Sequence, residues 1–209
     1  MLVAMMLYAG FQLLEVSDSM DVFHEANRWC GQTFYEPQLL GPSCESVIAS
    51  SGAAVGTTGC YASATGAFDI VVVPGSPPGG PTPDQHKIVE WLRNAGPATP
   101  RLASLSGGAL LIARAGLARQ RWLTTHERYV KRLAAEYPAT HVFASEACLK
   151  DGNLYSSGSA RAGLHLALAL VREDLGAQAA GHIAGSLGLQ MPAAAPSDSL
   201  NGTIRWTPT

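Results

Sequence analysis

The sequence predicts an α/β fold in which a mostly parallel sheet is covered by helices on both faces. Continuous apolar runs at residues 2–7 and 68–73 indicate strands that are buried on both sides. Segments with helical periodicity follow these runs, and strands that alternate with helices are typical of parallel sheets. With 209 residues, of which 47% are apolar, the chain can bury a substantial core. Sheets of this kind bind ligands beyond the carboxyl ends of their strands.

The chain begins with a strand, a turn and a helix. After the strand at 2–7, a helix is expected over residues 21–29, where three apolar side chains fall near helical spacing. Two further strands are expected over 33–40 and 45–51. Pro37 favours a place at the sheet edge for the first of them, because proline has no N–H to donate to a neighbouring strand.

The helix after the strand at 68–73 has a complete set of boundary signals. The strand itself ends in a Pro-Gly stop. Thr82 can cap the helix, Pro83 occupies its first position, and Gln85 completes a capping box. Gly96, followed by a proline, ends it.

The second half of the chain repeats the alternation. Strands are expected over 102–105, 121–125, 141–145 and 148–158, and helices over 107–115, 126–136 and 160–176. The pair Asp151-Gly152 is typical of a two-residue hairpin turn. Gly176 is expected to end the last helix.

The last residues differ in composition from the rest. From about Met191 the sequence is rich in proline, alanine, serine and threonine and has little periodic pattern. We therefore expect a domain over residues 1–190, followed by a linker or tail over 191–209.

Composition also predicts the compartment. The four cysteines show no C-x-x-C spacing and are too few for a disulfide scaffold, which favours a reducing environment. The apolar opening is short and lacks a basic segment before it, and no apolar run has the length of a membrane span. A cytoplasmic protein without a membrane partner is expected.

Several classes of function have no support in the sequence. The net charge is −2 and the 14 basic residues are scattered, which argues against a nucleic-acid-binding surface on this chain. The segments that begin at His24 and His126 both lack the second histidine of H-E-x-x-H, and no other cluster has metal-ligand spacing. No G-x-G-x-x-G or P-loop is present, so neither a metal nor a cofactor is expected.

Candidate chemistry gathers at three strand ends. Glu15 follows the first strand, and Ser106 lies where the strand at 102–105 turns into a helix. Gly75 and Ser76 follow the strand that ends in the Pro-Gly stop. Because the carboxyl ends of parallel strands meet at one edge of a sheet, these residues can converge.

Ser106 has two interpretations. At a strand-to-helix elbow it can be an exposed nucleophile near backbone N–H groups and the positive end of a helix. That environment stabilises a thiolate, but a serine hydroxyl also needs an adjacent base. The G-x-S-x-G motif is absent, because Ser104 stands in the place of its first glycine. The alternative is that Ser106 caps the helix.

Glu15, Gly75 and His126 also have two interpretations each. Glu15 is either the acid partner of an elbow nucleophile or a solvated loop carboxylate. Gly75 either presents its backbone N–H to an anion or belongs to a plain turn. His126 follows another strand and is either a functional group or a helix cap.

Several segments, in this order and spacing, resemble the ThiJ/PfpI superfamily. They are "FQLLEVSDSMDVFHEANR", "IVVVPGS", "RLASLSGGALLIARAGL", "RWLTTHERYVKRLAAEYP" and "KDGNLYSSGSARAGLHLALALVREDLG". Within this class I glutamine amidotransferase-like superfamily, the chain resembles most the N-terminal domain of AraC-type transcriptional regulators, a branch similar to isonitrile hydratases. The resemblance covers residues 1–189.

The resemblance implies a flavodoxin-like three-layer sandwich and a site at the elbow. The family position that matches Ser106 is usually a cysteine, the acid that supports its thiol matches Glu15, and the glycine that lends a backbone amide matches Gly75. The ligand-binding positions that we expect around them are Gly75, Ser76, Gly107, Thr125, His126, Ser157 and Gly158.

Serine in place of the family cysteine argues against thiolate chemistry. We therefore expect a dimeric ligand-sensing domain for a small amide- or nitrogen-containing metabolite, with Ser106 donating a hydrogen bond to Glu15. The resemblance further implies that DNA is bound only through a helix-turn-helix domain absent from this chain. The alternatives are a hydratase or amide hydrolase with a nucleophile at Ser106, and a structural or dimerisation module.

Overall fold

A mostly parallel sheet of eight strands crosses the computed structural model, which describes residues 1–64, 67–77, 82–144, 148–158, 161–189 and 203–206. In sheet order the strands are β12 (Thr203–Trp206), β10 (Cys148–Asp151), β11 (Leu154–Ser157), β7 (Arg101–Leu105), β6 (Ile70–Val73), β1 (Leu2–Met6), β2 (Glu36–Gly41) and β5 (Gly59–Cys60). All pairings from β11 to β5 are parallel, whereas β10 is antiparallel to both β11 and β12. The predicted fold class is confirmed.

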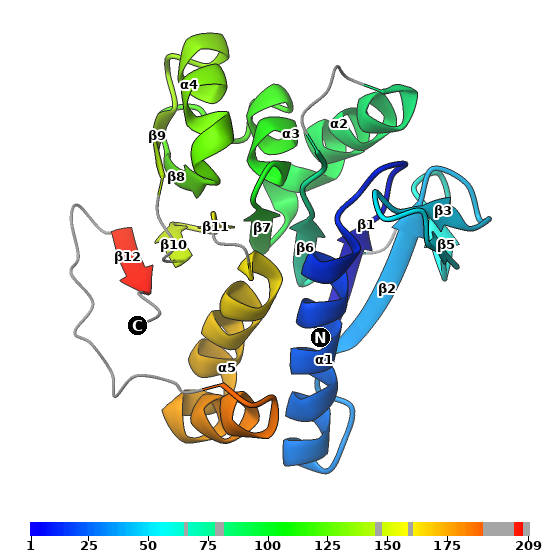
Figure 1. Cartoon of the computed structure of the whole chain (residues 1–209), viewed down its shortest axis with the longest axis vertical. Coiled ribbons are helices and arrows are strands. Elements are labelled where there is room, and N and C mark those ends of the chain that lie inside the picture. The colour runs from blue at the N-terminus through cyan, green and yellow to red at the C-terminus, as the bar shows by residue number, and fades with distance from the viewer. Residues whose placement is uncertain (65–66, 78–81, 145–147, 159–160, 190–202, 207–209) are drawn as a thin grey trace.

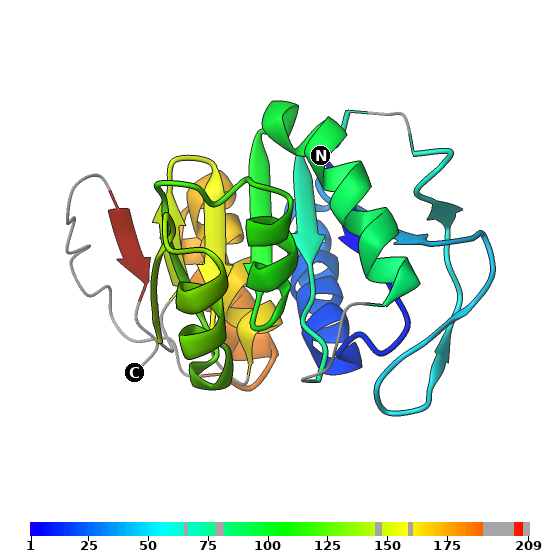
Figure 2. The same ribbon diagram turned by 90° about the horizontal axis from the view of Figure 1, so that it is seen from above.

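Helices cover both faces of this sheet (Figures 1 and 2). One layer holds α1 (Leu13–Cys30) and α5 (Ala162–Ser186), which pack against each other. The other holds α2 (Pro83–Ala95), which runs into the short helix η1 (Gly96–Ala98), with α3 (Gly108–Arg114) and α4 (Glu127–Glu136). Two small sheets complete the fold, β3 (Val47–Ile48) with β4 (Ala54–Val55), and β8 (Trp122–Thr125) with β9 (His141–Ala144).

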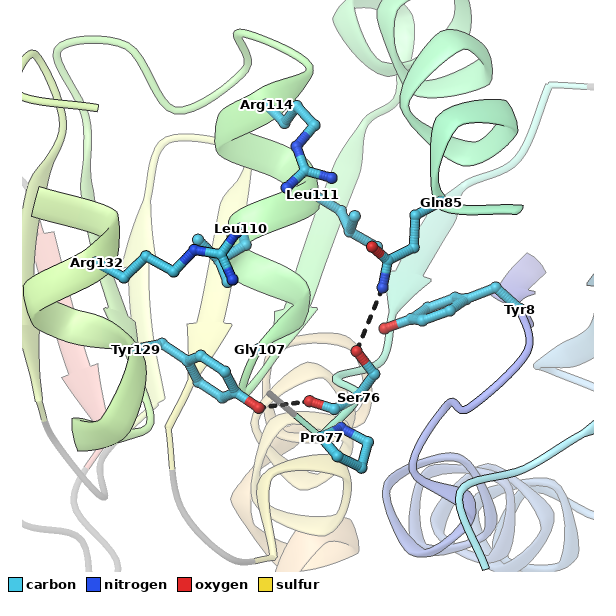
Figure 3. Close-up of a pocket in the computed structure, with 10 residues that line it drawn as sticks. All are labelled: Tyr8, Ser76, Pro77, Gln85, Gly107, Leu110, Leu111, Arg114, Tyr129 and Arg132. Carbon is cyan, nitrogen blue, oxygen red and sulfur yellow. Dashed lines mark hydrogen bonds between the residues drawn. The ribbon is translucent and has the colours of Figure 1, made fainter. Parts of the chain in front are cut away.

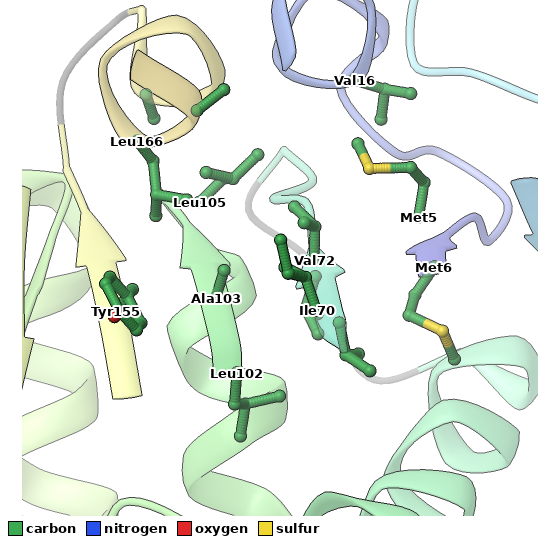
Figure 4. Close-up of a cluster of buried hydrophobic side chains, with 14 of the residues drawn as sticks. Met5, Met6, Val16, Ile70, Val72, Leu102, Ala103, Leu105, Tyr155 and Leu166 are labelled. Carbon is green, nitrogen blue, oxygen red and sulfur yellow. The ribbon is translucent and has the colours of Figure 1, made fainter. Parts of the chain in front are cut away.

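The core lies on both faces of the central strands (Figure 4). Every residue of β6 is buried, and so are the last four residues of β1 and of β7. Their alternating side chains meet α1 and α5 on one side, and α2 and α3 on the other. Burial on two faces explains why these strands are uniformly apolar in sequence. Their carboxyl ends are therefore held rigidly side by side.

The first helix starts earlier than its sequence pattern indicates. It begins at Leu13 and not near residue 21, because the polar segment before residue 21 is buried against another part of the chain. Asp18 pairs with Arg161 at 2.8 Å, and the Ser19 hydroxyl donates to the Glu15 carbonyl at 2.9 Å. A pattern search treats such polar residues as a loop, since the partner of Asp18 lies more than 140 positions away.

The last helix extends beyond its predicted end. Gly176 has φ 87° and ψ 168°, so it interrupts the helix as predicted, but a second helical segment continues to Ser186. Within the predicted tail, β12 pairs with β10 at the sheet edge. Residues 191–202 and 207–209 lie outside the described part of the chain.

Pro37 lies in β2, which has a neighbour on each side and so is not an edge strand throughout. Pro37 pairs with Val3 of β1, whereas β5 contacts only Leu40 and Gly41 on the outer side. The missing N–H of proline is therefore tolerated because the outer side of β2 is open at this position.

Candidate functional site

The chain turns sharply between β7 and α3, at Ser106. Its φ of 47° lies in the left-handed region, which residues other than glycine adopt rarely and at a cost of about 1 kcal/mol or more. Two contacts hold this backbone. The Ser106 N–H donates to the Ser157 carbonyl at 2.7 Å, and the Thr125 hydroxyl donates to the Ser106 carbonyl at 2.6 Å. Gly107, not Ser106, occupies the N-cap position of α3.

Glu15 lies beside the elbow, in the first turn of α1. Its side chain is buried, which rules out a solvated loop carboxylate. Its carboxylate accepts a hydrogen bond from the Gly75 N–H at 2.7 Å and another from the Ser106 side chain. Burial raises the pKa of Glu15 to about 7, although the hydrogen bonds from Gly75 and Ser106 oppose this rise.

The chain after β6 approaches the chain after β7 so closely that position 75 requires glycine. A Cβ at this position would lie 2.8 Å from the Gly107 nitrogen and 3.3 Å from the Ser106 Cβ. Because the nearest of these atoms belongs to the backbone, it cannot move aside, and only glycine fits. The structure thus brings together Glu15, Gly75 and Ser106, the three strand-end residues that the sequence singles out.

The stability of Glu15→Gln relative to wild type should increase as the pH rises. The folded pKa of about 7 exceeds the ordinary value of 4.5, so the carboxyl group's stabilising contribution is complete below pH 4.5 and is lost as the pH rises through 7. We expect the stability difference between Glu15→Gln and wild type to move in favour of the variant by on the order of 2 kcal/mol between pH 5 and pH 8.

Urea unfolding at the two pH values measures this difference. Glu90→Gln, which changes an exposed carboxylate on α2, is the matched control. A difference in unfolding free energy between Glu15→Gln and wild type that is equal at both pH values would contradict the raised pKa of Glu15.

The other predicted site residues surround the elbow in different ways. Thr125 and Ser157 are buried and hold its backbone, as described above. Gly158 follows β11 and is also buried. His126 is the N-cap of α4, where its Nδ1 accepts from the Arg128 N–H at 3.3 Å, so the ring has the capping role that was one of its two interpretations.

A pocket adjoins the elbow on the side of α2, α3 and α4 (Figure 3). Its empty space of about 330 Å³ includes open solvent, and the enclosed part, about 20 Å³, has room for about one water molecule. Its lining residues are Tyr8, Ser76, Pro77, Gln85, Gly107, Leu110, Leu111, Arg114, Tyr129 and Arg132. Ser76 and Gly107 are therefore the predicted residues that reach it, whereas Ser106 and Glu15 lie behind them and do not line it.

Tyr129 forms one wall of this pocket. Its ring lies against Gly107, where a Cβ would be 3.0 Å from the ring, and its hydroxyl donates to the Ser76 carbonyl. Burial raises the pKa of Tyr129, while the nearby cations of Arg128 and Arg132 oppose this rise. Tyr129 thus connects the pocket wall to the chain that follows β6.

The pocket is rich in hydrogen-bond donors. Arg114 Nη1 is buried and has no partner among the described residues, and Gln85 donates to the Ser76 hydroxyl at 3.3 Å. Arg132 pairs with Glu136 through its Nε at 2.6 Å. None of the ten lining residues is acidic. The pocket is therefore suited to a ligand that carries acceptor oxygens or a negative charge.

The sequence alone does not identify most of the residues that line the pocket, although several of them lie at helical spacing on one face of their helix. Gly107, Leu110, Leu111 and Arg114 share one face of α3 at helical spacing, and Tyr129 and Arg132 share one face of α4. The sequence does not reveal that these two faces oppose each other.

Within the described residues, no group of three or more histidine, cysteine, aspartate or glutamate side chains is placed to hold a metal ion. The helices that the structure describes include none with the length and apolarity needed to cross a membrane.

Fold and elbow together define a known class of protein. The model of the DJ-1/PfpI family matches residues 1–173, and the chain belongs to this family. The chain is 28% identical over 132 residues to isonitrile hydratase from Pseudomonas putida, a match that covers 63% of this chain and 56% of the relative. It is 26% identical over 176 residues to the HTH-type transcriptional regulator GlxA from Rhizobium meliloti (strain 1021), covering 83% and 53%. The chain thus spans about half the length of these curated relatives.

Solved structures share the fold. An AraC family transcriptional regulator from Pseudomonas putida superposes with a TM-score of 0.80 at 22% identity, covering 89% of this chain and 98% of that one. DJ-1beta from Drosophila melanogaster gives a TM-score of 0.74 at 18% identity, covering 90% and 97%. These likenesses establish the flavodoxin-like architecture of the chain.

Proposed function

We propose that this chain is the small-molecule-sensing domain of an AraC-type transcriptional regulator and binds its ligand without transforming it. The observation that carries the proposal is Ser106, a hydroxyl at the elbow of a family in which this position is usually a cysteine. The similarity to a regulator over 83% of the chain supports it. DNA would be bound by a helix-turn-helix domain outside this chain, and the domain would act as a cytoplasmic homodimer.

The surroundings of Ser106 favour binding over catalysis. A serine nucleophile needs a base that removes its proton, and Glu15, with a pKa of about 7, is far weaker than the alkoxide that must form. His126 uses its Nδ1 to cap α4. Ser106 is only 4% exposed, and the adjoining pocket is lined by its neighbour Gly107. The hydroxyl therefore serves as a hydrogen-bond donor to Glu15.

The lining of the pocket supports a ligand of particular chemistry. A buried guanidinium nitrogen without a partner is costly, and a ligand oxygen that accepts from Arg114 Nη1 removes that cost. We propose a small amide- or nitrogen-containing metabolite that also carries a carboxylate, held by Arg114 with the Gln85 amide beside it. Leu110 and Leu111 would contact its apolar part.

Binding should be visible as thermal stabilisation by a panel of small amino, amide and carboxylate compounds. We expect at least one carboxylate-bearing compound to raise the melting temperature of the protein and to remain chemically unchanged. Arg114→Gln should weaken its affinity by roughly 10- to 100-fold, because a charge-assisted hydrogen bond is lost. Arg119→Gln, at an exposed arginine outside the pocket, is the control and should bind normally.

The alternative function is a hydratase or amide hydrolase, and the similarity to isonitrile hydratase favours it. Incubation with isonitriles and amides, followed by mass analysis, separates the two. Steady product formation that disappears in Ser106→Ala would establish the enzyme and overturn the sensing proposal.

A further inference from the structure

Two of the four cysteines meet at the end of the sheet where β2 and β5 pair. Cys60 lies in β5 opposite Gly41 of β2, and Cys44 lies in the loop that follows β2. This loop folds back toward β5, because the Thr57 hydroxyl donates to the Glu45 carbonyl at 3.0 Å. As a result the side chains of Cys44 and Cys60 lie close enough for each thiol to shift the pKa of the other, although no short sequence motif joins them.

The two thiols have different environments. The Cys60 sulfur lies 3.2 Å from the Ser63 hydroxyl, and the interactions with Cys44 and Ser63 lower the pKa of Cys60 to about 7. The same interaction with Cys60 raises the pKa of Cys44. Cys60 is thus the more acidic thiol of the pair and Cys44 the less acidic one, which is the arrangement of an attacking and a resolving thiol.

Both thiols are accessible to small reagents. Cys44 is exposed and Cys60 is partly exposed. Cys148, in contrast, is buried and its pKa is raised to about 12, so it is protected and unreactive. The chain therefore has one reactive pair of thiols, and it lies in a different part of the fold from the elbow.

We propose that Cys44 and Cys60 are a redox site that a peroxide converts to a reversible disulfide. The Cys60 thiolate attacks one peroxide oxygen, the O–O bond breaks, and the sulfur becomes a sulfenic acid while the other oxygen leaves as water or an alcohol after protonation. The Cys44 thiol then attacks this sulfur and releases water. Two thiols are oxidised to one disulfide, the peroxide is reduced by two electrons, and a dithiol reductant reverses the reaction.

The disulfide would fasten the loop after β2 to β5. It closes a loop of about 15 residues, which reduces the freedom of the unfolded chain and should raise the melting temperature by roughly 6–12 °C. This inference does not depend on the proposed ligand-sensing function.

Peptide mapping of the whole chain tests it directly. The reduced protein is treated with a small excess of hydrogen peroxide, remaining thiols are alkylated, and the chain is cleaved after glutamate and after aromatic residues. Cleavage after Tyr35 and Glu45 places Cys30, Cys44 and Cys60 on separate peptides. We expect the Cys44 and Cys60 peptides to be joined, and the link to disappear after dithiothreitol.

Serine variants show which thiols form the link. Cys30→Ser should form the same link, whereas Cys44→Ser and Cys60→Ser should not, and only wild type and Cys30→Ser should gain melting temperature on oxidation. Melting curves of the reduced variants show that each one folds. The proposal would be overturned by links that involve Cys30 or by links that form only between molecules. It would also be overturned if no link forms and Cys60 is alkylated at an ordinary rate.

Discussion

Replacing Ser106 by cysteine should produce a thiol whose pKa lies roughly one to three units below the ordinary value of about 8.5. The backbone at residue 106 is already held at φ 47° by Ser157 and Thr125, so the change does not require a new conformation. The thiol would lie at the N-terminal end of α3, and Glu15, which is partly protonated near pH 7, can donate a hydrogen bond to the thiolate.

Thiolate absorbance in the ultraviolet, followed against pH as the difference between variant and wild type, measures this pKa. Ser50→Cys, at an exposed serine, is the matched control and should titrate near the ordinary value. A pKa for residue 106 at or above 8.5 would show that the elbow does not stabilise negative charge. Turnover of isonitriles or amides by Ser106→Cys alone would identify the native serine as the reason for a lack of catalysis.

Replacing Gly163 by alanine should cost about 3 kcal/mol or more of folding free energy. Gly163 lies in the first turn of α5, where a Cβ would be 1.9 Å from the Glu15 carbonyl oxygen and 2.8 Å from the Ser19 hydroxyl. The nearer atom belongs to the backbone of α1, so α1 and α5 must move apart. The expected fall in melting temperature is roughly 6–12 °C.

The same helix supplies the control for this prediction. Gly181 also lies in α5, but a Cβ there would meet no atom within 4 Å. Gly181→Ala should therefore be neutral or stabilising by up to about 1 kcal/mol, since alanine favours a helix. Equal losses in the two variants would mean that helix propensity, and not the contact between α1 and α5, determines the result.

The sequence predicted those parts of the fold whose signals are local. The strands β1 and β6 are continuous apolar runs, and α2 carries its own boundaries, since the Thr82 hydroxyl accepts from the Gln85 N–H as a capping residue should. The start of α1 was missed because Asp18 and Ser19 are polar yet buried, and their partners come from Arg161, just before α5, or from the same buried turn.

In the candidate site, too, some residues could be predicted from the sequence and others could not. Glu15, Gly75 and Ser106 follow strands that are neighbours in a parallel sheet, so topology alone predicts that they meet. Arg114 and Tyr129 could not be assigned to one pocket, because the packing of α3 against α4 depends on tertiary contacts. The proximity of Cys44 to Cys60 likewise depends on the register of β2 and β5.

The strained turn at Ser106 has a consequence for the evolution of this chain. Its geometry is maintained by neighbouring backbone and by Thr125, so the side chain at position 106 can change without a change of fold. Most serine codons are one base away from a cysteine codon. A lineage can therefore exchange a hydroxyl for a thiol in a single mutational step, and ligand binding and covalent chemistry are neighbouring outcomes of the same gene.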